Sequence, residues 1–205
     1  MPRRGRTGVV VVALACALST GCAGTTVVNS PQAFPANVST KDAAALAAAG
    51  VPWSDSRRLT WADFAGRPDP ASAASAMTAY LLNYEGECAD SIFRFTVRST
   101  FLPGQAWVRT SMLLSTYHGA LALQHEQTHF DLSEVQARAL RADLAAIPNA
   151  CDRPDDEIGA IVERHMRADA QTQRRYDRET GHGTDALAQG RWDADVREQL
   201  QARTR

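Results

Sequence analysis

The sequence has no excess of positive charge: its 205 residues carry 22 basic and 23 acidic side chains, a net charge of −1. A protein that binds nucleic acid usually shows a basic stripe or patch, so we expect no nucleic-acid partner. The chain also lacks a long apolar segment after its N-terminus. The apolar run near the N-terminus, residues 9–18, is itself too short to span a bilayer as a mature helix. The sequence therefore predicts no transmembrane helix.

The N-terminal segment has the features of a secretory signal. Three arginines, at positions 3, 4 and 6, precede the apolar run of residues 9–18, and Gly21-Cys22 follows it. Residues 18–22 are similar to a bacterial lipoprotein processing site, which predicts a signal peptide over residues 1–22 and a lipid anchor on Cys22. Ordinary cleavage nearby, giving a secreted protein, is the alternative. We expect an exported protein, a periplasmic or cell-surface lipoprotein or otherwise a secreted one, with the anchor as its membrane contact.

Cysteine is scarce in the expected mature protein. Cys16 and Cys22 belong to the signal segment, which leaves Cys88 and Cys151. Two cysteines in an oxidising compartment favour one disulfide. The alternative, a pair of zinc-binding thiolates, is less favoured because the two residues lack a close C-x-x-C spacing. Without residues 1–21 the chain keeps 19 basic and 23 acidic side chains, a net charge of −4.

The remaining chain divides into a tether and one domain. Residues 23–52 are rich in small and polar residues and in proline, which predicts a flexible tether with a short helix within 41–49. Residues 53–205, about 150 residues, are enough for one core. The sequence predicts a single folded domain over 53–205.

Within this domain strands precede helices. Residues 92–101 alternate between apolar and polar side chains, as a half-buried strand does. The predicted fold class is α+β, with a small antiparallel sheet of about three strands followed by a helical part. An edge at residues 107–109 could pair with an extended peptide substrate. The predicted strands cover 77–84, 92–101 and 107–108, and the predicted helices cover 111–147 with a break at Gly119, 154–180 and 184–201.

The strongest functional motif is His125-Glu126-Gln127-Thr128-His129. Residues four apart lie on one helix face, so His125 and His129 can bind one metal ion. Zinc lowers the pKa of a bound water to about 7, and Glu126 can then act as the general base. The alternative is an exposed helix with a polar face. Apolar periodicity around the motif indicates a buried helix instead, in which these side chains need partners.

A third zinc ligand is expected from residues 176–183. His182 lies between two glycines at a helix end, where the chain can turn sharply, and it is the favoured candidate. Asp177 and Glu179 remain alternatives. Tyr176 is a candidate donor to the oxyanion of a tetrahedral intermediate, although packing between helices would also explain it. Asp131 could hold a ligand imidazole in the right tautomer.

Three blocks of residues together resemble the DUF922 family of bacterial exported proteins, which are predicted to be zinc-dependent proteases. The resemblance covers about residues 55–200. It implies a zincin-like metallopeptidase domain over residues 53–205 and carries the two metal ligands and the base over to His125, His129 and Glu126. The blocks are Trp61-x-Asp63-Phe64-x-Gly66-x-Pro68, His125-Glu126-Gln127-x-His129-Phe130-Asp131, and Tyr176-Asp177-x-Glu179-Thr180-x-His182-Gly183 with Gln189-x-x-Trp192.

These observations predict zinc-dependent hydrolysis of peptide bonds in a peptide or protein substrate. Glu126 would take the proton of the attacking water and pass it to the leaving amine. Two other functions fit the same motif. One is a zinc-stabilised binding lipoprotein without turnover, whose metal has four protein ligands. The other is an amidase that acts on peptide cross-links of the cell wall.

Overall fold

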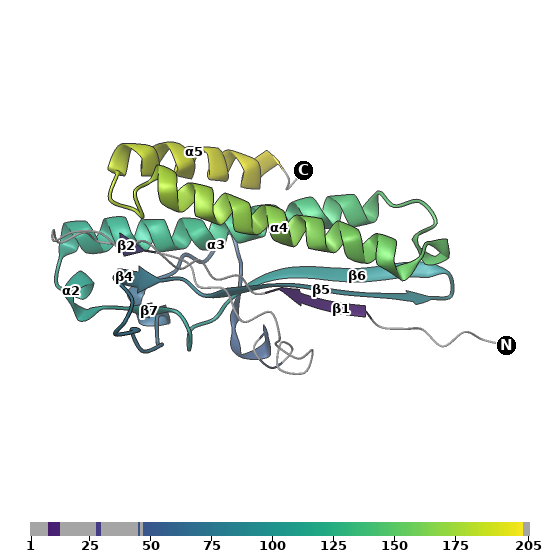
Figure 1. Ribbon diagram of the computed structural model, residues 1–205, viewed down its shortest axis with the longest axis horizontal. Coiled ribbons are helices and arrows are strands. Elements are labelled where there is room, and N and C mark those ends of the chain that lie inside the picture. The colour runs from purple at the N-terminus through teal and green to yellow at the C-terminus, as the bar shows by residue number, and fades with distance from the viewer. Residues whose placement is uncertain (1–7, 13–27, 30–44, 46, 203–205) are drawn as a thin grey trace.

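The structure is a computed structural model, and it describes residues 8–12, 28–29, 45 and 47–202 (Figure 1). The predicted lipid anchor at Cys22 and most of the predicted tether lie outside the described residues. Among the helices of the described part, none is long and apolar enough to cross a membrane. The domain is a mixture of a small antiparallel sheet and several helices, which confirms the predicted α+β fold class.

A long hairpin forms the centre of the sheet. Strand β5 (Tyr80–Ala89) pairs antiparallel with β6 (Ile92–Phe101), from Tyr80 opposite Phe101 to Ala89 opposite Ile92. The two turn residues, Asp90 and Ser91, have φ angles of 52° and 60°. Positive φ at both positions matches the right-handed twist of the flanking strands. The predicted strand over 92–101 is confirmed, whereas its partner begins three residues later than expected.

The strands are divided between two sheets and do not form one meander. One sheet has the order β1-β5-β6-β3, with β1 at Gly8–Val12 and β3 at Val51–Pro52. The second has the order β2-β4-β7, with β2 at Val28–Asn29, β4 at Ala74–Met77 and β7 at Trp107–Val108. The prediction of a single three-stranded meander is therefore wrong in its connectivity, although β7 does lie at a sheet edge as expected.

Residues 59–68, which we call the entry segment, explain why β7 pairs away from the hairpin. Ala65 N donates to Pro103 O at 3.0 Å, and Gly66 N donates to Ala106 O at 2.8 Å. A Cβ on Gly66 would lie 2.8 Å from the same Ala106 oxygen, so only glycine allows this approach. The chain after β6 is thus bound to the entry segment and pairs with β4 instead of β5.

Part of the predicted signal peptide forms a strand. Gly8–Val12 is β1, which pairs antiparallel with β5 from Gly8 opposite Gly86 to Val12 opposite Leu82. Valine favours an extended backbone, and β5 offers a free edge to any such segment. Removal of residues 1–22 would leave that edge of β5 unpaired.

The helices that follow the strands are α2 (Thr110–Leu113), α3 (Thr116–Ala145), α4 (Asp155–Glu179) and α5 (Ala186–Ala202). The helix break that was predicted at Gly119 lies earlier, between α2 and α3. There the Ser115 side chain accepts a hydrogen bond from His118 N and caps the start of α3. Gly119 lies inside α3, where a Cβ would be 2.4 Å from Met112 O. It permits the close approach of α2 and does not end the helix.

Helix α3 is the central layer of the domain. Figure 1 shows α4 crossing α3, with α5 on the side away from the sheet. Residues 125–135 of α3 are all buried, polar side chains included. The larger core lies between the hairpin, α3 and α4. A second core joins α3, α4 and α5, and its buried members are Leu132, Val135, Tyr176, Trp192, Val196 and Leu200.

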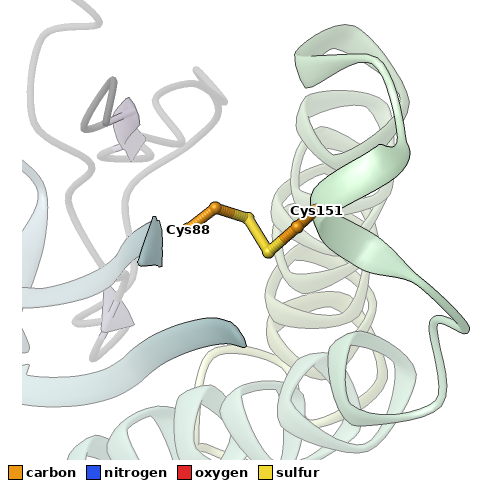
Figure 2. The surroundings of a disulfide bond; sticks show 2 residues. All are labelled: Cys88 and Cys151. Carbon is orange, nitrogen blue, oxygen red and sulfur yellow. A yellow bond between two sulfur atoms is a disulfide. The ribbon is translucent and has the colours of Figure 1, made fainter. Parts of the chain in front are cut away.

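A disulfide ties the hairpin tip to the start of α4. Cys88 near the end of β5 is bonded to Cys151 in the 3-10 turn Ala150–Asp152, with Cα atoms 5.6 Å apart (Figure 2). The predicted pairing of these two cysteines is confirmed. The bond closes a 63-residue separation, which in a chain-entropy treatment contributes about 4 kcal/mol to the free energy of unfolding.

Candidate metal centre

Three buried side chains from two helices point their donor atoms at one place. His125 Nε2 and His129 Nε2, one turn apart on α3, are 3.0 Å from each other. Asp177 Oδ1, from the last turns of α4, is 3.2 Å from His125 Nε2 and 3.0 Å from His129 Nε2. Both histidines are completely buried and Asp177 nearly so. Within the described residues these three form a group that could hold a metal ion.

The spacing of the three atoms suits a small cation. Tetrahedral ligands at about 2.0 Å from zinc lie about 3.3 Å from one another, close to the 3.0–3.2 Å observed here. Burial would raise the pKa of Asp177, but the neighbouring imidazoles of His129, His125 and His182 hold it below its usual value. The carboxylate is therefore ionised, and a negative oxygen faces the two imidazoles.

Glu126 is buried beside this group. Its Oε2 accepts a hydrogen bond from Thr78 N at 2.6 Å, and Thr78 Oγ1 donates to the backbone carbonyl of Glu126 at 3.0 Å. Its Oε1 has no hydrogen-bond partner among the described residues. Burial raises the pKa of Glu126 to about 7, against the opposing effects of His125 and Thr78. The carboxyl group can therefore hold or release a proton near neutral pH.

The favoured third ligand, His182, lies next to the group and not within it. His182 Nδ1 is 3.6 Å from Asp177 Oδ1, and His182 N donates to Asp177 O at 2.8 Å. About a third of its side chain, 32%, is exposed. Glu179, the other alternative, accepts a hydrogen bond from Trp192 Nε1 at 3.0 Å and lies outside the group. Of the three candidates, the structure brings Asp177 to the two histidines.

A left-handed turn carries His182 and returns the chain to α3. Gly181, His182 and Gly183 have φ angles of 55°, 54° and 79°. A Cβ on Gly183 would lie 2.8 Å from His125 Cγ and 2.9 Å from His125 Cβ. Glycine is thus required at 183 both by the backbone conformation and by contact with a candidate ligand. The sequence pointed to a sharp turn here, but not to this contact.

Tyr176 packs against the site with its ring. The ring stacks on His125, with centroids 4.6 Å apart and an interplanar angle of 17°. Its hydroxyl donates to Gln189 Oε1 at 2.6 Å, and burial raises its pKa well above the usual value. This arrangement corresponds to the packing alternative and leaves the hydroxyl engaged away from the donor atoms. Asp131 accepts from Trp53 Nε1 and contacts neither candidate ligand by a hydrogen bond in the described structure.

Two glutamines at the site were not anticipated. Gln189 Oε1 lies 3.1 Å from His125 Nδ1, and Gln173 Oε1 lies 2.7 Å from His129 Nδ1. A signal for Gln173 was available, because it precedes Asp177 by four residues and so shares its helix face. Gln189 belongs to a motif block, but its spacing alone does not indicate its partner.

Comparisons with known proteins give one match. The model of a family described as a bacterial protein of unknown function, DUF922, matches residues 55–183. This stretch includes the donor atoms of α3 and α4 and the left-handed turn, and it ends just before α5. No curated protein and no solved structure matches the chain.

Proposed function

The chain belongs to the DUF922 family of bacterial proteins of unknown function, and we propose that it is a zinc-dependent metalloprotease. His125, His129 and Asp177 are the proposed zinc ligands, with Asp177 taking the place expected of His182. The observation that carries the proposal is the buried carboxylate of Glu126, which lies beside the donor group with one oxygen that has no partner among the described residues.

Such an oxygen calls for a functional explanation. A buried acceptor without a hydrogen bond costs about 1–3 kcal/mol, and a purely structural site gains nothing from it. Thr78 fixes Oε2 of Glu126 at 2.6 Å, so the carboxyl group is held in one orientation while Oε1 stays available. This suits a general base, which must be positioned within hydrogen-bond reach of the proton it takes.

The chemistry follows from these positions. When bound, zinc would acidify a coordinated water and polarise the carbonyl of the scissile peptide bond. Glu126 takes a proton from the attacking water at Oε1 and delivers it to the nitrogen of the leaving amine. The negative charge of Asp177 and two neutral imidazoles would leave a bound zinc with a net positive charge, as a Lewis acid requires.

An exported setting agrees with this proposal. The Cys88–Cys151 disulfide is typical of oxidising compartments, and the predicted signal peptide would deliver the protein there. We propose a peptide or protein of the cell envelope or its surroundings as the substrate, and a lipid on Cys22 as the link to the membrane.

The test is the Glu126→Gln variant assayed on fluorescently labelled denatured casein. Loss of the carboxylate should abolish hydrolysis, while zinc content stays near one per protein because no ligand is removed. Glu163→Gln is the matched control, since this exposed glutamate on α4 pairs with Arg167 far from the donors in sequence. Normal cleavage by Glu126→Gln would overturn the assigned base.

A second function is favoured by the depth of the site. His125, His129 and Glu126 are completely buried, and His182 is close enough to Asp177 to become a fourth donor after a small shift. Four protein ligands would make a closed structural site in a binding protein without turnover. In that case His182→Ala would lose zinc and stability, whereas the protease proposal expects near-full zinc in this variant.

A further inference from the structure

Each of the paired histidines is held by a buried glutamine on its side away from Asp177. Gln173 on α4 meets His129 Nδ1 at 2.7 Å, and Gln189 on α5 meets His125 Nδ1 at 3.1 Å. We infer that Gln173 and Gln189 are positioning residues that fix both imidazoles with hydrogen on Nδ1. This inference rests on the metal site of the proposed function, but not on hydrolysis.

The orientation of the Gln173 amide is determined by its other partners. Its Nε2 donates to the backbone carbonyl of His129 at 3.1 Å and to Asp169 Oδ1 at 3.2 Å. A carbonyl oxygen can only accept, so the NH₂ group must lie on that side. The amide oxygen then faces His129 Nδ1. Tyr80 Oη donates to Asp169 Oδ2 at 2.5 Å and anchors the chain of bonds to β5.

The Gln189 amide is oriented in the same way. Its Nε2 donates to Asp193 Oδ1 at 2.7 Å, and its Oε1 accepts from the Tyr176 hydroxyl at 2.6 Å. Asp193 Oδ1 also accepts from Thr128 Oγ1 at 2.6 Å, which fixes the carboxylate to α3. The oxygen of Gln189 is therefore the atom that faces His125 Nδ1.

An amide oxygen only accepts hydrogen bonds, so each Nδ1 must carry the hydrogen. A neutral imidazole with hydrogen on Nδ1 presents a lone pair at Nε2. Both Nε2 lone pairs then face Asp177 Oδ1 at 3.0–3.2 Å. The two glutamines thus turn the donor atoms of both rings toward the place where a metal would bind.

Two helices repeat one arrangement to achieve this. Asp169 and Gln173 are four residues apart on α4, and Gln189 and Asp193 are four residues apart on α5. In each pair the aspartate holds the amide and the amide holds one imidazole. Partners of this kind typically contribute a factor of about 10–100 to metal affinity. The arrangement thus lets α4 and α5 each control one ligand of α3.

The test uses Gln173→Met and Gln189→Met, which keep side-chain length and remove the acceptor. Ring ¹⁵N NMR of the metal-free protein above pH 8 reports which nitrogen carries the hydrogen. We expect hydrogen on Nδ1 of both histidines in the wild type and on Nε2 of His129 in Gln173→Met. Zinc affinity, measured by competition with a chromophoric chelator, should fall about 10–100-fold in each methionine variant.

The matched control is Gln136→Met, because Gln136 contacts the ring of His165, which lies outside the donor group. Its zinc affinity should equal that of the wild type. If a methionine variant does not fold, the ring ¹⁵N spectrum of the wild type alone decides the inference.

Hydrogen on Nε2 of either ligand histidine in the wild type would overturn the inference, as would unchanged zinc affinity in folded methionine variants. Neither measurement depends on cleavage. A protein with the expected tautomers and zinc affinities but no activity on casein would refute the protease and support the role of the two glutamines.

Discussion

Replacement of Gly183 by alanine tests the geometry of the site most directly. The added Cβ would lie 2.8 Å from His125 Cγ, and the backbone at 183 has a φ of 79°. The left-handed conformation costs an alanine about 1–2 kcal/mol, and forcing a methyl group into a packed site costs about 1–3 kcal/mol. We expect Gly183→Ala to lower the free energy of unfolding by about 2–5 kcal/mol.

The same variant should weaken metal binding. The His125 ring stacks on Tyr176 and is bonded to Gln189, so it cannot move from the new methyl group without losing these contacts. Its Nε2 would then turn away from Asp177, and zinc affinity would fall together with stability. A variant that lost stability alone would show that the turn and the metal position are independent.

Urea unfolding and zinc titration of the metal-free protein measure both effects. Gly159→Ala is the control, because a Cβ on this α4 glycine meets nothing within 4 Å. In a helix interior that change should stabilise the protein by about 0.5–1 kcal/mol. Equal urea midpoints and zinc affinities for Gly183→Ala and the wild type would refute the close contact from which these magnitudes are derived.

Three further predictions concern the ligands, the tyrosine and the disulfide. Asp177→Ala should lose most bound zinc in metal analysis while His182→Ala keeps it, and the reverse result would return the third ligand to His182. Tyr176→Phe should keep its cleavage rate to within a few-fold on casein, whereas an oxyanion donor would cost about 100–1000-fold in kcat. Reduction of Cys88–Cys151 should lower the free energy of unfolding by about 4 kcal/mol without changing zinc content; an unchanged thermal midpoint in reductant would contradict that.

Local patterns in the sequence were sufficient for several elements. The alternation over 92–101 predicted β6, and the apolar periodicity predicted the buried helix that carries His125 and His129. The pairing of Cys88 with Cys151 followed from their number and expected compartment. In each case the physical cause lies in neighbouring residues or in chemistry that does not depend on the fold.

Features that depend on distant segments were missed. The division into two sheets follows from the backbone hydrogen bonds of Ala65 with Pro103 and of Gly66 with Ala106. No periodicity in the sequence reveals these contacts. Asp177 was only an alternative to His182, but Asp169, Gln173 and Asp177 are spaced by four residues and form a buried polar stripe on α4. Polar residues at that spacing on an otherwise apolar face are a sign of a shared partner that could have been used.

Helix α5 has a consequence for where this protein can be shortened. The family match ends at residue 183, whereas α5 spans Ala186–Ala202. A recombinant fragment that stopped at the matched boundary would expose the apolar side of α3 and α4 on which Trp192 and Leu200 rest, and it would free the His125 ring from Gln189. The folded unit therefore includes α5, and shortened forms of the protein should keep this final helix.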